Sequence, residues 1–164
     1  MAKILVFLFF PLAVSCLGQQ SMESVLKLHN KGSVPYIQAA KLANENGFTL
    51  LDARESEEFG VSHLENAEWI GYDDFDIEKF ALQFPDKNAS FVVYCSIGVR
   101  SEDIGEQLQK AGYTNVQNLY GGIFEWKNKA YPVVDSTNKK TEKVHAYSKY
   151  WGRLLTNAEK VYSP

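Results

Sequence analysis

The centre of the chain reads Phe91-Val92-Val93-Tyr94-Cys95-Ser96-Ile97-Gly98-Val99-Arg100-Ser101. Its first four residues form an apolar run that predicts a buried strand. A loop with a glycine and an arginine follows the cysteine, and Ser101 with the two acidic residues after it predicts the start of a helix. The segment therefore predicts a thiol at the carboxyl end of a strand and at the mouth of a helix.

We interpret Cys95 as a reactive cysteine. The free N–H groups of the helix start, the positive end of its macrodipole and the guanidinium of Arg100 all favour a thiolate. Gly98 allows the loop to curl tightly, so that its amides point inward and bind an anion. A cysteine packed in a core is the alternative, but Ser96, Gly98 and Arg100 are poor core neighbours.

The composition is that of an ordinary globular protein. The chain has 164 residues, 45% of them hydrophobic, which is enough for one domain with a sizeable core. The net charge of -3 argues against nucleic acid as a partner, because no cluster of Lys and Arg offers a footprint for phosphates. Lys139, Lys140 and Lys143 come closest, and a solvated linker explains them better.

Residues 1–18 predict a secretory signal peptide. Lys3 precedes an apolar run from Ile4 to Val14, and small residues follow at Ser15 and Gly18. The run is too short for a comfortable membrane span. We therefore expect export, either as a soluble periplasmic protein or as a membrane-anchored lipoprotein.

Cys16 distinguishes these two forms of export. Residues 12–16 resemble an imperfect lipobox, and a lipidated Cys16 would tether the protein to a membrane surface. Cleavage before Gln19 would instead remove Cys16. In both cases Cys95 is the only free thiol of the mature domain, which excludes an intrachain disulfide and points to a working thiol in an oxidising compartment.

The remaining sequence alternates between short strands and helices. Residues 19–33 predict a polar spacer with at most one helical turn. We expect strands at 34–37, 48–51, 67–70, 91–94 and 116–119, and helices at 38–46, 77–84, 101–111 and 123–129. This alternation predicts an α/β fold with a central, mainly parallel sheet flanked by helices, and ligands at the carboxyl ends of its strands.

Two local features have alternative interpretations. Trp69 is predicted to be a core anchor. A calcium site is one interpretation of the acidic residues Asp73, Asp74 and Asp76. They lack the spacing and the final glutamate of a calcium loop, so helix capping explains them better. We expect no metal and no cofactor.

Residues 136–164 predict a linker followed by an aromatic and basic tail. Val144, Tyr147, Trp151 and Leu155 fall near helical spacing. The tail is therefore expected to be a helix that packs on the domain, or a segment that binds a protein partner, although Gly152 weakens any helix drawn through it.

Several separate blocks resemble the rhodanese family in its single-domain form. They are Leu51-Asp52-Ala53-Arg54 with Glu58-Phe59, Ser62-His63-Leu64 with Asn66-Ala67, Cys95 to Ser101, and Gly121-Gly122-Ile123 with Trp126. The resemblance covers residues 34–135. It implies a three-layer fold with a central mainly parallel sheet, and chemistry in which a sulfane sulfur passes through a cysteine persulfide.

The resemblance also implies roles for individual residues. Cys95 would accept the sulfur, and Arg100 would add positive charge to the loop. The backbone amides that would cradle the anionic sulfur belong to Ser96, Ile97, Gly98, Val99 and Arg100. Structural support would come from Asp52, Arg54, Glu58, His63 and Ser101, with the first three forming one paired charge network. Ser62 stands where the family often has a glycine.

These observations predict an exported single-cysteine sulfurtransferase. Its donor would be a small anion such as thiosulfate, and its acceptor a thiol or cyanide. Related phosphatases and arsenate reductases have five residues between cysteine and arginine, whereas this loop has four and leaves less room for a tetrahedral oxyanion. A non-catalytic sulfur carrier or partner-binding module is the alternative, and a phosphatase or arsenate reductase is a weaker one.

Overall fold

The structure is a computed structural model that describes residues 21–163. The predicted signal peptide and Cys16 lie outside the described residues. Within 21–163, no helix has both the length and the apolar character needed to cross a bilayer.

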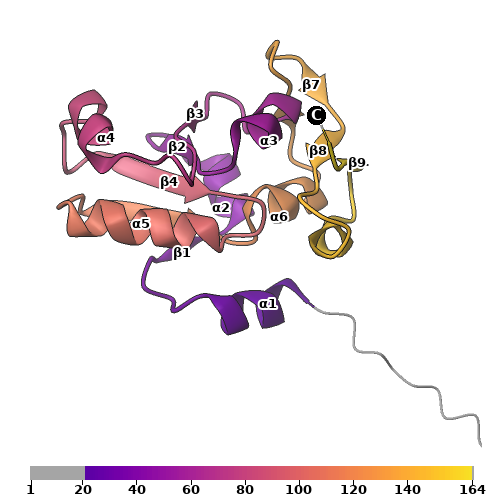
Figure 1. The fold of residues 1–164 in the computed structure, drawn as a ribbon, viewed down its shortest axis with the longest axis horizontal. Helices are drawn as coiled ribbons and strands as arrows, with labels where there is room; N and C mark the ends of the chain where they lie inside the picture. Colours follow the sequence, from indigo (N-terminus) through magenta and orange to yellow (C-terminus); the bar gives the residue numbers. More distant parts are fainter. Residues whose placement is uncertain (1–20, 164) are drawn as a thin grey trace, which may run out of the picture.

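Five parallel strands form the central sheet (Figure 1). They are β1 (Tyr36–Ile37), β2 (Thr49–Asp52), β3 (Glu68–Trp69), β4 (Ser90–Tyr94) and β5 (Asn115–Leu119). Their order is β1-β5-β4-β2-β3, so β4 is the central strand and pairs with β2 on one side and β5 on the other. All of these pairings are parallel, as the sequence predicts.

Helices cover both faces of the sheet. Five of them follow the strands in turn: α2 (Ala39–Asn44), α3 (Ser56–Val61), α4 (Ile77–Gln83), α5 (Arg100–Lys110) and α6 (Gly122–Asn128). Side chains alternate along β4, so Phe91 and Val93 pack with α4 and α5 on one face. Val92 and Tyr94 pack with α2 and α6 on the other. Burial on both faces explains why β4 reads as a continuous apolar run.

The predicted spacer is wrong for residues 22–29, which form the helix α1 (Met22–His29). Ser21 caps this helix through a capping box with Ser24. Val25 packs in the core on the α2 and α6 face, and Leu26 is buried as well. The polar residues around this short apolar pair hid its amphipathic character. This region is therefore part of the packed molecule.

The prediction of Trp69 as a core anchor is also wrong. The residue is 46% exposed, because β3 is a two-residue strand at the edge of the sheet. Its indole Nε1 donates to the Arg54 carbonyl at 2.8 Å. The capping role of the acidic residues is confirmed for Asp76, whose side chain accepts from two amides in the first turn of α4.

The described part of the C-terminal segment, residues 136–163, contains strands and a short 3-10 helix where one α-helix was expected. Its elements are β7 (Lys140–Thr141), β8 (Lys143–His145), η1 (Trp151–Leu154) and β9 (Glu159–Val161), and β7 pairs with β6 (Val133–Val134). β8 and β9 pair in parallel, and Tyr147 has a φ of 61°, which interrupts any helix there. Val144 and Leu155 are fully buried, so the segment packs on its own domain.

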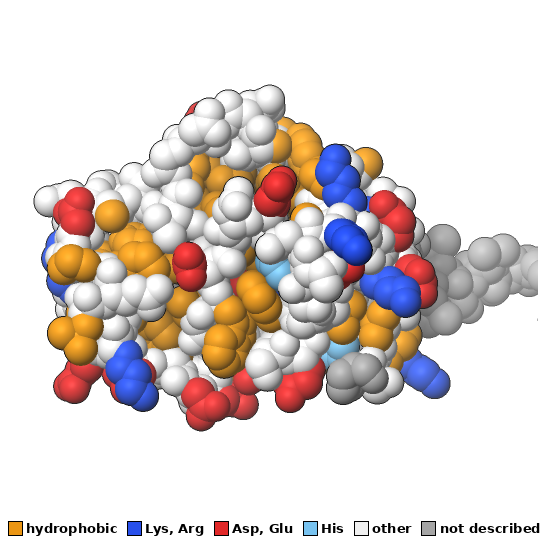
Figure 2. Space-filling model, turned by 90° about the horizontal axis from the view of Figure 1, so that it is seen from above, with side chains coloured by type: hydrophobic (Ala, Val, Ile, Leu, Met, Phe, Trp, Pro, Cys, Tyr) orange, Lys and Arg blue, Asp and Glu red, His pale blue; other side chains and the backbone are white. Residues whose placement is uncertain are grey.

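This segment lies at the carboxyl end of β4. In Figure 1 the arrowhead of β4 points toward the end of the molecule where α3 and β8 meet. Figure 2 shows the adjoining face, on which acidic and basic side chains are interspersed with separate hydrophobic patches.

Two leucines on α1 test whether this helix is an integral part of the fold. Leu26 is 3% exposed and Leu28 is 72% exposed. We expect Leu26→Ala to lower the free energy of unfolding by about 2–4 kcal/mol, since it removes buried methyl groups and leaves a cavity. Leu28→Ala should change it by less than about 0.5 kcal/mol. Urea denaturation measures both, and equal effects would contradict the packing of α1.

Candidate active site

Cys95 lies directly after β4, and four residues separate it from Arg100 at the start of α5. The loop returns an amide to the sulfur: Gly98 N–H donates to Cys95 Sγ at 3.1 Å. Gly98 has a φ of 101°, a left-handed conformation that favours glycine. A Cβ there would also lie 3.3 Å from the Leu119 carbonyl oxygen. The glycine therefore allows the loop to close on the sulfur.

Two asparagines hold the carbonyl of Gly98 away from the sulfur. Asn118 Nδ2, on β5, donates to this oxygen at 2.8 Å, and so does Asn30 Nδ2, at the C-cap of α1. Sequence reasoning missed both residues. The predicted strand reads Val116-Gln117-Asn118-Leu119, so no local signal distinguishes Asn118 from the neighbouring Gln117.

Ser101 does not cap the helix, which corrects the sequence interpretation. The N-cap is Val99, which makes no side-chain cap hydrogen bond, and Ser101 is fully buried in the first turn. Its Oγ lies 2.8 Å from Asn118 Oδ1 and 3.6 Å from Cys95 Sγ. A hydroxyl carries one proton, so Ser101 donates to one of these two acceptors at a time.

The start of α6 fixes the other end of the loop. The amides of Ile123 and Phe124 donate to the carbonyls of Cys95 and Ser96, at 2.9 and 3.1 Å. Gly122 has a φ of 55°, and a Cβ on it would overlap the Cys95 carbonyl oxygen. Gly122 thus permits a close approach of α6 to the cysteine loop.

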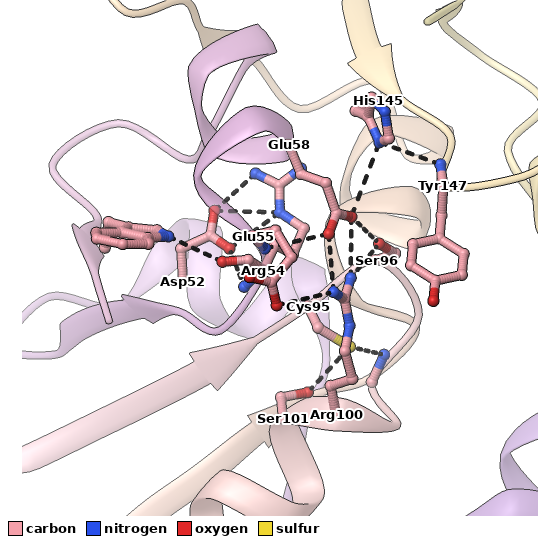
Figure 3. Close-up of polar contacts among 12 residues, drawn as sticks. Asp52, Arg54, Glu55, Glu58, Cys95, Ser96, Arg100, Ser101, His145 and Tyr147 are labelled. Carbon is pink, nitrogen blue, oxygen red and sulfur yellow. Dashed lines mark hydrogen bonds and ion pairs between the residues drawn. The ribbon is translucent and has the colours of Figure 1, made fainter. Parts of the chain in front are cut away.

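Arg100 is paired with Glu58 (Figure 3). Its Nη1 donates to Glu58 Oε2 at 2.8 Å and its Nη2 to Oε1 at 2.9 Å. Ser96 Oγ also donates to Glu58 Oε1, at 2.9 Å. The sequence analysis expects Arg100 to add positive charge to the loop, and that role stays a prediction. The structure adds that a carboxylate partly compensates this charge.

Burial and pairing act in opposite directions on this ion pair. Burial alone would raise the pKa of Glu58, but the hydrogen bonds and charge of Arg100 hold that pKa below its usual range. Burial alone would lower the pKa of Arg100, and Glu58 raises it instead. Both groups are therefore ionised at neutral pH.

Asp52 and Arg54 form a second, separate pair. Arg54 Nε donates to Asp52 Oδ1 at 2.9 Å and Nη2 donates to Oδ2 at 2.6 Å, and both side chains are fully buried. Arg54 also donates to the Ser62 carbonyl, at 2.6 Å. The expected single network of Asp52, Arg54 and Glu58 is thus two pairs, of which only the Glu58 pair reaches the cysteine loop.

His63 packs beside this region without a hydrogen bond to the cysteine loop. Its ring stacks on Phe59 with centroids 3.9 Å apart, and its Nδ1 lies 3.0 Å from the Phe59 carbonyl oxygen. Its backbone pairs with Val134 as an isolated bridge. His63 therefore ties the end of α3 to β6.

The C-terminal segment adds two residues that sequence reasoning did not place at the site. His145 Nδ1 lies 4.0 Å from Glu58 Oε1 and accepts the Tyr147 N–H at 3.3 Å (Figure 3). Burial lowers the pKa of His145 and favours its neutral form. The Tyr147 ring lies 5.1 Å from the Arg100 guanidinium carbon. Only the fold brings these groups to Cys95, since nothing local marks them.

A cavity of about 140 Å³ opens onto Cys95. The cysteine loop forms its base, and His29, Tyr147 and Trp151 form much of its wall. Cys95 itself is 1% exposed, so a reagent reaches the sulfur through this cavity. Among residues 21–163, no three His, Cys, Asp or Glu side chains are grouped to hold a metal ion.

This geometry defines a class of protein. A thiol that receives a backbone amide at the end of a central parallel strand, below a small cavity, suits group transfer through a covalent cysteine intermediate. A family model described as a rhodanese-like domain matches residues 37–129. The chain belongs to the rhodanese-like family, and the domain suggests activity of the sulfurtransferase type.

Individual relatives are more distant. The tRNA uridine(34) hydroxylase of Erwinia tasmaniensis is 32% identical over 101 residues, which are 58% of this chain and 29% of that protein. A probable adenylyltransferase/sulfurtransferase MoeZ of Mycobacterium tuberculosis is 29% identical over 83 residues, 51% of this chain and 21% of that protein. The chain thus spans less than a third of the length of these relatives.

A solved structure supports the same family. The crystal structure of a rhodanese-related protein from Thermoplasma volcanium is similar with a TM-score of 0.53 and 30% identity, over 61% of this chain and 97% of that one. The similarity leaves a large part of this chain unmatched. The residues outside the family model include α1 and the C-terminal segment.

A glycine comparison tests the close approach of α6. Gly122 and Gly112 both have positive φ, but a Cβ on Gly112 meets nothing within 4 Å. We expect Gly122→Ala to displace the cysteine loop. The rate at which a thiol-reactive reagent labels Cys95 should then differ from the native rate. Gly112→Ala should carry only the cost of backbone strain, about 1 kcal/mol of unfolding free energy. Native labelling in Gly122→Ala would contradict this account.

The ion pair of Glu58 with Arg100 predicts that the free energy of unfolding depends on pH. The folded pKa of Glu58 lies below its unfolded value, so its contribution is present above the unfolded pKa and is lost as the pH falls through the folded one. We expect the free energy of unfolding to fall between about pH 5 and pH 3. This slope should be shallower in Glu58→Gln. Glu57→Gln, an exposed neighbour on α3, should keep the native slope in urea titrations.

Proposed function

We propose that this protein transfers a sulfane sulfur through a persulfide on Cys95. In the first step the Cys95 thiolate attacks the outer sulfur of a thiosulfate-like donor. The donor's S–S bond breaks, and its electron pair leaves with sulfite when the donor is thiosulfate. Cys95 then carries the sulfur as an anionic persulfide.

The observation that carries this proposal is the position of the Cys95 sulfur. Gly98 N–H points at it from 3.1 Å, and Ser101 Oγ lies 3.6 Å away. Donors at these positions stabilise the Cys95 thiolate before it attacks the donor and again when the acceptor releases it. The remaining loop amides, of Ser96, Ile97, Val99 and Arg100, are proposed to surround the outer sulfur.

In the second step an acceptor removes the sulfur. A cyanide ion attacks the outer sulfur and leaves as thiocyanate, whereas a thiol leaves as an organic persulfide. In each case the bond from Cys95 Sγ to the outer sulfur breaks, and its electron pair restores the thiolate. The loop spacing of four residues favours this chemistry over phosphate transfer, because a short loop closes around a single sulfur atom.

We further propose that the protein works outside the cytoplasm. The basis is the signal-like sequence of residues 1–18, together with Cys95 as the only cysteine beyond it. Export is proposed to be either periplasmic or as a lipoprotein tethered through Cys16. A role of the C-terminal segment in binding a protein partner remains a further proposal.

Intact mass spectrometry tests the first step. Incubation with excess thiosulfate should add the mass of one sulfur atom to the protein, and cyanide should remove it with release of thiocyanate. Cys95→Ser should gain no sulfur, because an alkoxide does not form at neutral pH. Ser101→Ala keeps the thiol and should load more slowly, by about tenfold if the hydroxyl stabilises the sulfur anion.

The same mass measurement can contradict the proposed sulfur transfer. If neither thiosulfate nor polysulfide adds sulfur to Cys95, the protein is not a sulfurtransferase of this kind. Protein purified from its native compartment also reports, by its mass, whether residues 1–18 were removed and whether Cys16 carries lipid.

A further inference from the structure

We propose that the two segments flanking the rhodanese-like domain form an acceptor pocket that selects a small, uncharged, apolar thiol. The inference rests on the proposed persulfide chemistry of Cys95. It assigns the choice of acceptor to His29, Tyr147 and Trp151, which lie outside the residues that the family model matches.

The pocket wall is built where the two ends of the described chain meet. His29 is the last residue of α1, and Trp151 is the first residue of η1. Their rings pack edge to face with centroids 5.7 Å apart. Tyr147 completes the wall beside the Arg100 guanidinium. Aromatic rings of this kind offer large apolar contact areas and edge or face contacts to another ring.

The size of the cavity limits the acceptor. Its volume is about 140 Å³. An apolar cavity of about 150 Å³ holds a molecule the size of benzene. A thiol with a single ring or a short chain therefore fits beside the sulfur, whereas a tripeptide thiol such as glutathione does not fit inside.

The charges around the cavity disfavour an anionic acceptor. Among residues 21–163, Arg100 is its only permanently charged lining residue, and Glu58 compensates that charge through two hydrogen bonds. The centroid of the Tyr147 ring lies 5.1 Å from the guanidinium carbon. A thiosulfate donor would place its charge beside the loop amides, but a thiol whose charge lies far from its sulfur would place it against the aromatic wall, where it loses hydration without gaining a free cation. An uncharged thiol loses little.

The backbone around Tyr147 shows that its position is enforced. A φ of 61° is unusual for a bulky residue and costs conformational energy. The hydrogen bond from its N–H to His145 Nδ1 holds this conformation. The neighbouring Ala146 is fully buried and anchors the turn. The strained residue is therefore the one whose ring, itself half exposed, stands beside the cavity.

The reaction in this pocket conserves atoms and charge. The acceptor enters as the neutral thiol and gives its proton to the outer sulfur of the anionic Cys95 persulfide. The thiolate so formed attacks that sulfur and forms a new S–S bond. The bond between Cys95 Sγ and the outer sulfur breaks, and its electron pair remains on Sγ as the thiolate. The product is the hydropersulfide of the acceptor, and no external oxidant or reductant is consumed.

Single-turnover discharge of the loaded protein tests the proposal. Cys95 is loaded with thiosulfate or polysulfide, excess donor is removed, and loss of the sulfur is followed by intact mass. The acceptors are benzyl mercaptan, 2-mercaptoethanol, 2-mercaptoethanesulfonate and glutathione. We expect benzyl mercaptan to discharge the protein at least about tenfold faster than 2-mercaptoethanol at equal concentration, through its contact with the aromatic wall. The anionic thiols should be slower still.

Variants of the wall assign the preference to its residues. Trp151→Leu should lower the ratio of the discharge rates of benzyl mercaptan and 2-mercaptoethanol about tenfold, because it removes the aromatic contact made by the first thiol. Trp151→Phe should keep most of the preference. Tyr162→Leu is the matched control, since Tyr162 is a partly exposed aromatic residue of the same segment that does not line the cavity.

The outcomes separate the two proposals. If neither thiosulfate nor polysulfide adds a sulfur to Cys95, the proposed function fails, and the acceptor pocket fails with it. If Cys95 loads and all four thiols discharge it equally, only the acceptor pocket is overturned. The same holds if the preference survives in a folded Trp151→Leu. Should that variant fail to fold, the comparison of thiols on the native protein still decides the selectivity.

Discussion

The orientation of the peptide groups in the four-residue loop after Cys95 is the constraint on which the site depends. Its outward carbonyls are held from several directions: Gly98 by Asn30 and Asn118, and Cys95 and Ser96 by the first amides of α6. An amide whose carbonyl is fixed outward must point its N–H inward. The sheet, α1 and α6 thus act together on one sulfur atom, which no local sequence preference would place.

Local signals predicted the elements that position this loop. The apolar run of β4, the acidic start of α5 and its terminal Gly112 are each readable within a few residues, and these elements formed near the expected bounds. The edge position of Trp69 and the packing of α1 were not readable, because both depend on neighbours far away in the sequence. The prediction of a helix in the C-terminal segment was wrong for a similar reason, because β8 pairs with the distant strand β9.

The same distinction applies to the site. The local sequence marks Cys95 and the loop that follows it, but the partner of Arg100 lies 42 residues away on α3. A sequence shows a guanidinium without showing whether a carboxylate compensates it. The electrostatic character of the site, which decides between charged and uncharged ligands, is therefore a property of the tertiary structure.

The edge-to-face contact of His29 with Trp151 joins the two segments that flank the rhodanese-like domain. Residues 37–129 match the rhodanese-like family, and the proposed sulfur chemistry lies there, whereas His29 and Trp151 belong to the segments on either side that line the cavity. Substitutions at Tyr147 or Trp151 would change what enters the cavity, whereas Asn30 also holds the Gly98 carbonyl of the cysteine loop. New specificities would therefore arise by exchange of side chains on these flanks and not by their removal, because both flanks also contribute to the buried core.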